Sequence, residues 1–227
     1  MFWKGEPWML KLEAASYTYN DNHKAIFTEL NYEFVAGGRY ILRGKNGSGK
    51  STLIQILANR RTLTSGRLIS EAKSVIYLPQ QLQLADGFIY TAKEFLNNAI
   101  ELIKRQQKHK SKLKLNAPNT LANLAKRYTS LVNDFKLETS LELPVSALSF
   151  GQKQKLLLVR ALLGQADLYL MDEAWSSLDQ ATIQKLPAIF AKYIVANSCL
   201  IQISHDPENL WSDYTCLHFP LLTEVKK

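Results

Sequence analysis

The N-terminal part of the chain alternates between apolar and polar positions, which is typical of half-buried strands. A glycine pair, Gly37-Gly38, follows the second apolar segment and signals a turn. This pattern predicts antiparallel strands before Gly44. The apolar positions expected to share a face are Leu10, Leu12 and Ala14 in one segment, and Ile26, Leu30, Tyr32 and Phe34 in the next.

Strand and helix patterns alternate from Tyr40 onward. Residues 40–42 predict a buried strand, and residues 51–57 carry the apolar stripe of a helix. Residues 64–66 predict a turn. A second buried strand over 74–78 is expected to stop at Pro79, because proline cannot donate to a strand ladder. This alternation indicates an α/β core.

The periodicity between about residues 91 and 139 is helical instead. The α/β pattern then returns with a helix over 152–163, a strand over 168–171, a helix over 182–195 and a strand over 199–203. We therefore predict an α/β fold with a mainly parallel sheet, an N-terminal antiparallel β-subdomain and an inserted α-helical subdomain. The helical stripes are Phe95, Leu96, Ala99, Ile100 and Ile103, then Leu121, Leu124, Ala125 and Tyr128.

The composition fits a chain with a substantial core, since 46% of its 227 residues are hydrophobic. No apolar run approaches the roughly 18 residues that a membrane-spanning helix needs, and residues 1–7 lack the apolar region of a secretory signal. The two cysteines, Cys199 and Cys216, do not have the spacing of a zinc site. We expect a soluble, cytoplasmic chain with two reduced thiols.

The chain is basic, with a formal net charge of +8 and a pI near 9.4. This charge favours phosphate-rich partners, whether nucleotide, nucleic acid or an anionic membrane surface. Much of it lies in the run from Lys104 to Lys114. Such a run is more often a solvated helix end and loop, and the alternative is a surface that contacts anionic lipid headgroups or a partner.

The segment from Gly44 to Ser51 fits the phosphate-binding loop pattern G-x-x-x-x-G-K-[S/T] at every fixed position. Glycines let the backbone curl so that amide N–H groups point at phosphate oxygens, and the following helix offers its positive N-terminal end. In this pattern Lys50 binds the β- and γ-phosphates, and Ser51 is a ligand of Mg²⁺. The predicted nucleoside triphosphate site comprises Gly44, Lys45, Asn46, Gly47, Ser48, Gly49, Lys50, Ser51 and Thr52.

A second acidic motif follows the predicted strand over 168–171, where Asp172 and Glu173 stand next to each other. Successive strand residues point in different directions, so the two carboxylates are expected to have different tasks. We expect Asp172 to hold Mg²⁺ through its water shell and Glu173 to act as general base on the attacking water.

Between these motifs lies Leu148-Ser149-Phe150-Gly151-Gln152, and with it the chain resembles the nucleotide-binding subunits of ATP-binding cassette (ABC) proteins, whose signature is LSGGQ. The resemblance covers nearly the whole chain and implies a P-loop NTPase core. It implies that Ser149, Gly151 and Gln152 contact the γ-phosphate held by a second subunit. Phe150 replaces the family glycine, and we expect a working site because aromatic variants resemble those that the family tolerates.

The same resemblance implies one ABC ATPase domain over residues 1–227. Its β-subdomain and RecA-like core are expected in residues 1–90 and 148–227, and its helical subdomain in about 91–147.

Three further residues match the family's motifs in order. Gln80 resembles the Q-loop glutamine that senses Mg²⁺ and the γ-phosphate, with Gln81 and Gln83 as alternatives in the register. Asp179 ends a segment that resembles the D-loop, which crosses the dimer interface. His205 follows a predicted strand and resembles the switch histidine that hydrogen-bonds the γ-phosphate.

Tyr19 is the best match for the family's aromatic residue that stacks on adenine, and Tyr17 is a close competitor. Either ring offers a flat apolar face to a base. Strand tyrosines also serve simply in packing, so the residues themselves leave both interpretations open.

The resemblance implies an ATP-binding and ATP-hydrolysing transporter subunit, with ATP and Mg²⁺ as its cofactors. Two such subunits sandwich two nucleotides and drive separate membrane permease subunits, at the cytoplasmic face of a membrane. A second hypothesis is a soluble ABC ATPase acting on nucleic acid, ribosomes or cluster assembly. The sequence offers no tandem cassette, coiled-coil arm or interleaved aromatics and arginines for it, so no specific nucleic acid is expected.

A third hypothesis is a nucleotide-gated regulatory subunit with little turnover. Glu173 and His205 argue against it, because both belong to the catalytic set of the family. A cassette resemblance does not carry a cargo with it.

Overall fold

The computed structural model describes residues 7–19, 25–80, 90–112, 121–204 and 213–224. The chain divides into two compact units. The first contains residues 1–80, 166–173 and 194–227, and the second contains residues 81–165 and 174–193. The subdomain division expected from the sequence, with a helical subdomain over about 91–147, stays a prediction.

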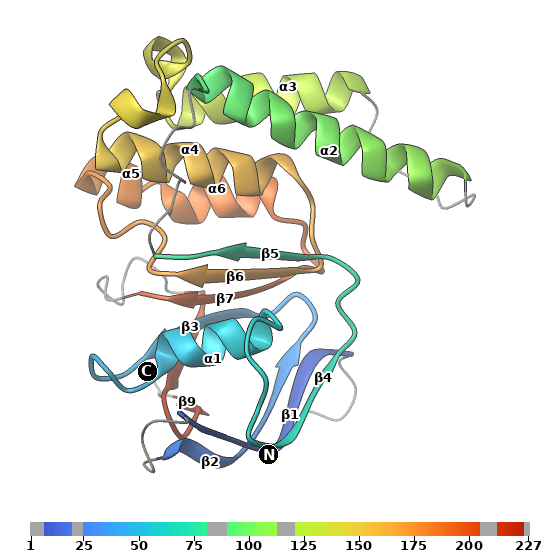
Figure 1. The fold of residues 1–227 in the computed structure, drawn as a ribbon, viewed down its shortest axis with the longest axis vertical. Helices are drawn as coiled ribbons and strands as arrows, with labels where there is room; N and C mark the ends of the chain where they lie inside the picture. Colours follow the sequence, from blue (N-terminus) through green and yellow to red (C-terminus); the bar gives the residue numbers. More distant parts are fainter. Residues whose placement is uncertain (1–6, 20–24, 81–89, 113–120, 205–212, 225–227) are drawn as a thin grey trace. The chain divides into compact units, whose positions relative to one another are not determined.

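The first unit holds a three-stranded antiparallel sheet in the order β2-β1-β4, formed by β1 (Trp8–Thr18), β2 (Ala25–Val35) and β4 (Ser65–Ser70) (Figure 1). The antiparallel strands predicted for the N-terminal segment are therefore present. Strand β4 was not predicted, because its glycine and serine residues indicated only a turn.

A bulge in β1 changes which residues face the core. The register of β1 against β2 shifts between Leu12 and Ala15, and Ala14 adopts a positive φ of 45°. As a result Ala15 is buried and Ala14 is exposed. The expected face that joined Leu10, Leu12 and Ala14 is therefore wrong at its third position, because an inserted residue reverses the alternation.

Within the described residues, the second sheet of this unit has six strands in the order β5-β6-β7-β3-β8-β9. The first five are parallel, and β9 pairs antiparallel with β8. This confirms the predicted mainly parallel sheet. Its strands are β5 (Val75–Leu78), β6 (Leu168–Asp172), β7 (Cys199–Ile203), β3 (Arg39–Arg43), β8 (Thr215–His218) and β9 (Thr223–Glu224).

Helix α1 (Lys50–Leu57) follows β3 and packs on this sheet against β6 and β7. Every residue of β6 and of β7 is buried, as expected for central parallel strands. The apolar side of α1, with Leu53, Ile54 and Ile56, joins residues of both sheets in one core. The site-bearing loops are thereby attached to a rigid framework.

The second unit is helical. It contains α2 (Ala92–Lys112), α3 (Leu121–Asp134), α4 (Phe150–Leu163), α5 (Gln180–Ile183) and α6 (Leu186–Tyr193), with two 3-10 turns at Glu138–Ser140 and Val145–Ala147. Helices α2 and α3 both pack on α4 (Figure 1). The helical periodicity predicted between about residues 91 and 139 is present in α2 and α3.

Two predicted helix boundaries differ from the structure. The helix expected over 152–163 begins two residues earlier, at Phe150, because Ser149 caps it. The single helix expected over 182–195 is instead α5 followed by α6. Pro187 lies in the first turn of α6, where its missing N–H costs nothing, and it was the sequence signal for this break.

None of the helices in the described part of the chain combines the length and hydrophobicity needed to cross a bilayer.

Candidate functional site

The phosphate-loop segment forms a tight turn between the end of β3 and the start of α1. Gly49 has φ 99°, and a Cβ placed there would lie 2.1 Å from Cγ2 of Ile26. Gly44 has φ 155°, and its Cβ would lie 2.9 Å from the carbonyl oxygen of Phe219. Both positions therefore require glycine, for conformation and for space.

The Lys50 side chain lies within this loop. Its ammonium donates hydrogen bonds to the carbonyl oxygens of Gly44 (2.9 Å) and Lys45 (3.0 Å). The residue is 6% exposed. The loop thus encloses a fixed positive charge at the N-terminal end of α1, where the helix dipole adds to its attraction for anions.

Ser51 and Asp172 connect α1 to the end of β6. The Ser51 hydroxyl donates to Oδ1 of Asp172 over 2.9 Å. Burial raises the pKa of the Asp172 carboxyl, and the charge of Glu173 acts in the same direction, whereas Ser51 and Lys50 oppose the shift. This pair presents hydroxyl and carboxylate oxygens, which are the ligands that Mg²⁺ prefers.

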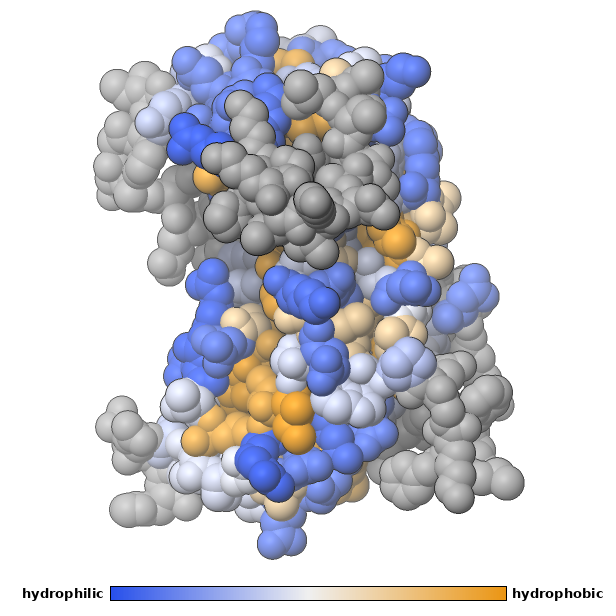
Figure 2. Space-filling model, turned by 90° about the vertical axis from the view of Figure 1, so that its right-hand side faces the viewer, coloured by the Kyte–Doolittle hydropathy of each residue, from blue (hydrophilic) through white to orange (hydrophobic). Residues whose placement is uncertain are grey.

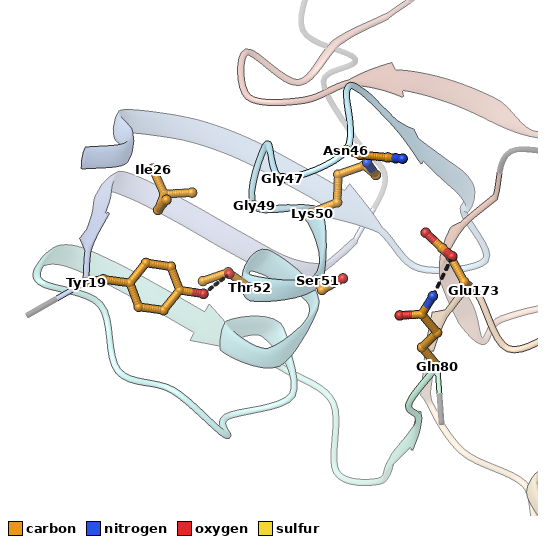
Figure 3. A pocket seen from close by; sticks show the side chains of 10 residues that line it. All are labelled: Tyr19, Ile26, Asn46, Gly47, Gly49, Lys50, Ser51, Thr52, Gln80 and Glu173. Atoms are coloured by element: carbon orange, nitrogen blue, oxygen red, sulfur yellow. Dashed lines mark hydrogen bonds between the residues drawn. The ribbon is translucent and has the colours of Figure 1, made fainter. Parts of the chain in front are cut away.

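Glu173, immediately after β6, faces Gln80, which follows β5. Nε2 of Gln80 donates to Oε2 of Glu173 over 2.9 Å (Figure 3). Glu173 has a positive φ of 47°, a conformation uncommon for a residue with a side chain. The turn therefore sends Glu173 out of the strand's regular alternation, and strain of this kind is often found at functional sites.

Most of these groups line one pocket of about 430 Å³, a volume in the range of small-molecule sites. Gly44, Lys45, Ser48 and Asp172 belong to the predicted site but are not among the lining residues of this pocket. Tyr19 lies at one end of the pocket, and Gln80 and Glu173 lie at the other (Figure 3). Lys50 and Ser51 lie between these ends, on the loop and helix (Figure 3). The lining residues are Tyr19, Ile26, Asn46, Gly47, Gly49, Lys50, Ser51, Thr52, Gln80 and Glu173.

Of the two tyrosines considered for base stacking, Tyr19 lines the pocket and Tyr17 does not. The hydroxyls of Tyr19 and Thr52 are 2.6 Å apart. Tyr17 is buried and stacks on Phe27, with ring centroids 6.4 Å apart. The sequence pattern placed Ile26 on one face with Leu30 and Phe34. In β2 Phe27 is buried instead, and Ile26 is half-buried and lines the pocket.

In the second unit, Ser149 and Gln152 form a capping box at the start of α4. The Ser149 hydroxyl accepts from the Gln152 backbone N–H over 3.2 Å, and the Gln152 side chain accepts from the Ser149 N–H over 2.8 Å. The intervening Phe150 is 49% exposed. The departure from the family glycine therefore leaves the cap intact.

The segment that resembles the D-loop lies against the first turns of α4. A Cβ at Gly151 would lie 2.9 Å from the carbonyl oxygen of Ser177. Asp179 caps α5 and pairs with Lys155 at 2.9 Å. Hydrogen bonds from Lys155, and then from Thr182, hold the pKa of the Asp179 carboxyl well below its usual range. His205 lies outside the described residues, as do the register alternatives Gln81 and Gln83.

Comparison with known proteins agrees with these motifs. A family model described as ABC transporter matches residues 27–176. The protein named hemin import ATP-binding protein HrtA in Staphylococcus epidermidis is 31% identical over 191 residues, covering 80% of this chain and 82% of the relative. The zinc import ATP-binding protein ZnuC of Rickettsia bellii is 32% identical over 169 residues, covering 73% of this chain and 63% of the relative.

Solved structures agree on the fold. A structure described as the ATP binding subunit of an ABC transporter has a TM-score of 0.70 at 20% identity and covers 92% of this chain and 85% of its own. An ABC transporter in an inward-facing conformation has a TM-score of 0.68 at 21% identity and covers 96% of this chain and 82% of its own. The chain belongs to the ABC transporter family, as an ATP-binding subunit whose ATP hydrolysis powers transport.

Proposed function

We propose that ATP binds in the pocket with its phosphates on the loop 44–49 and its base against Tyr19. The single observation that carries this assignment is the joint placement, in one pocket, of Lys50, Ser51, Gln80 and Glu173, which come from three separate parts of the chain. The loop amides and the Lys50 ammonium would hold the phosphates, and Thr52 would lie between the phosphate and base ends.

We further propose that Mg²⁺ binds beside Ser51 and Asp172, with Gln80 completing the set. The residues fit this ion, because the Ser51 hydroxyl and the Asp172 carboxylate already lie 2.9 Å apart and are hard oxygen donors. When bound, the ion would neutralise charge on the β- and γ-phosphates. Ser51 and Lys50 do not fully offset the effect of burial on Asp172, so its pKa remains raised. A bound cation would favour the charged carboxylate.

Glu173 is the proposed general base. Its carboxylate accepts a hydrogen bond from Gln80, which would orient it toward a water at the γ-phosphate and leave its second oxygen to take the proton. His205 would hydrogen-bond the γ-phosphate and steady that water.

A second subunit is proposed to complete the site. Ser149, Gly151 and Gln152 would contact the γ-phosphate held by that subunit, and Asp179 would lie at the interface. The capping box supports this role, because it fixes the N-terminal end of α4, which attracts anions. The partner is either another copy of this chain or a related cassette.

Transport would then require separate permease subunits, which would hold the chain at the cytoplasmic face of a membrane. The relatives of about equal identity are named for hemin import and for zinc import. Because these cargoes differ chemically, family membership assigns none to this chain.

The variant Glu173→Gln tests the catalytic assignment. It keeps the size and hydrogen bonding of the side chain and removes the base, so turnover should fall by at least about 100-fold while ATP affinity stays the same. Unchanged turnover would remove Glu173 from this role. Lys50→Ala is the companion variant, and it should weaken ATP binding itself.

Affinity purification of the full chain from its native membranes tests the transport assignment, with Lys50→Ala to show nucleotide dependence. Recovery of polytopic membrane proteins would support it. Recovery of ribosomes or nucleic acid without a membrane protein would contradict it.

A further inference from the structure

The ring of Tyr19 is held by contacts outside the pocket that no family motif predicts. Arg61 follows the C-terminal end of α1, and its guanidinium carbon lies 5.4 Å from the centroid of the Tyr19 ring. Tyr19 lines the pocket, whereas Arg61 does not. The arginine therefore contacts the Tyr19 ring from outside the set of residues that line the pocket.

Two hydrogen bonds fix Arg61 in this position. Nη1 donates to the hydroxyl of Tyr17 over 3.1 Å, and Nε donates to Oε1 of Gln55. Tyr17 belongs to β1 and Gln55 to α1, so the guanidinium joins the antiparallel sheet to the helix that follows the phosphate loop. A planar guanidinium can make both hydrogen bonds and still stack on a ring, which an ammonium cannot do.

The Tyr19 ring is consequently restrained on three sides. Its hydroxyl is 2.6 Å from that of Thr52, its ring meets the Tyr17 ring at 86° with centroids 5.2 Å apart, and Arg61 lies over one face. The ring still lines the pocket, where a flat ligand group can reach it. A ring fixed in advance loses less conformational freedom when a base stacks on it.

We propose that Arg61 is a positioning residue for nucleobase recognition, which acts by holding the Tyr19 ring in place from outside the pocket lining and by a cation–π interaction with that ring. This inference rests on the proposed function, in which the base binds against Tyr19. It assigns a role to a residue outside the pocket lining, and it predicts an effect on the base end of the ligand alone.

The test compares ADP with inorganic tripolyphosphate, which lacks a base, by calorimetric titration of the full chain. Arg61→Met should weaken ADP binding by about two- to fivefold, as expected for loss of an exposed cation–π contact, and leave tripolyphosphate binding unchanged. In steady-state assays KM for ATP should rise by the same factor with kcat unchanged. Arg60→Met is the matched control, because the Arg60 guanidinium carbon lies 4.8 Å from the ring centroid of Tyr77, a different tyrosine.

Tyr17→Phe provides a second variant. It keeps the ring and removes the hydroxyl that holds Arg61, so ADP binding should weaken by about twofold, again without an effect on tripolyphosphate. The inference is overturned if Arg61→Met binds ADP as tightly as Arg60→Met does, or if it loses ADP and tripolyphosphate equally. If the Lys50→Ala variant binds ADP as tightly as the wild-type chain, the proposed function on which the inference rests is overturned instead.

Discussion

Arg127 is predicted to be a major stabilising residue of the helical unit. Arg127 lies in α3, and its Nε donates to the carbonyl oxygen of Leu162 over 2.7 Å. Its Nη2 donates to the carbonyl oxygens of Gly164 (3.3 Å) and Tyr193 (2.6 Å). The guanidinium also lies 5.2 Å from the Tyr193 ring centroid. One side chain thus satisfies carbonyls at the C-terminal ends of both α4 and α6, where a positive charge is favourable.

These contacts determine how much stability the loss of Arg127 should cost. A hydrogen bond from a charged group contributes about 1.5–3 kcal/mol, and the half-buried setting and the long third bond reduce the sum. We expect Arg127→Met to lower the free energy of unfolding of this unit by about 2–4 kcal/mol. Arg127→Lys should lose about half as much, since an ammonium keeps the charge and reaches fewer of the carbonyls.

Urea denaturation followed by far-ultraviolet circular dichroism measures this loss, and hydrogen exchange locates it. Faster exchange should appear at the C-terminal ends of α4 and α6. Lys126→Met, at an exposed neighbouring position of α3, is the control. If Arg127→Met were as stable as that control, the carbonyl contacts would not contribute to stability as argued.

Two further predictions concern the loop and the cap. Gly49→Ala should abolish nucleotide binding, since a Cβ there would meet Ile26 at 2.1 Å. Adding Ile26→Ala should restore part of the affinity, because it relieves the contact although the strained φ remains. Equal affinities of the single and double variants would contradict this. Asp179 has a pKa lowered by Lys155 and Thr182, so its contribution to stability is fully present above its unfolded pKa, near 4, and is lost as pH falls toward the lower folded value. Melting temperatures measured from pH 7 to pH 3 should therefore fall less steeply for Asp179→Asn than for the wild-type chain, and parallel curves would contradict the assignment.

The site could be predicted from the sequence as far as its chemistry is local. The phosphate loop is a continuous segment whose glycines, lysine and serine act within a few residues of one another, and the structure places them as a turn between β3 and α1. Asp172 and Glu173 were recognisable because a buried strand ends at them. In each case the chain itself determines the geometry.

Other features depend on contacts between distant segments and left no local signal. The bulge at Ala14 shifts β1 against β2, and the Arg61 guanidinium reaches Tyr17 and Tyr19, which lie more than one strand earlier in the chain. An exposed Arg60-Arg61 pair is an ordinary surface sequence until the fold brings one of the two over an aromatic ring. Tertiary packing therefore decides which of two adjacent arginines belongs to the site.

The signature segment and the D-loop segment are joined within one body by contacts that bear on how the proposed dimer works. Oε1 of Gln154, a buried residue of α4, accepts a hydrogen bond from the Ser177 N–H over 3.0 Å. The next residue of the helix, Lys155, pairs with Asp179 at 2.9 Å. Gly151 permits this approach, since any Cβ there would press on the Ser177 carbonyl. Because both segments are expected to act across a subunit interface, these contacts would present them together, so that a change in one should disturb the geometry of the other.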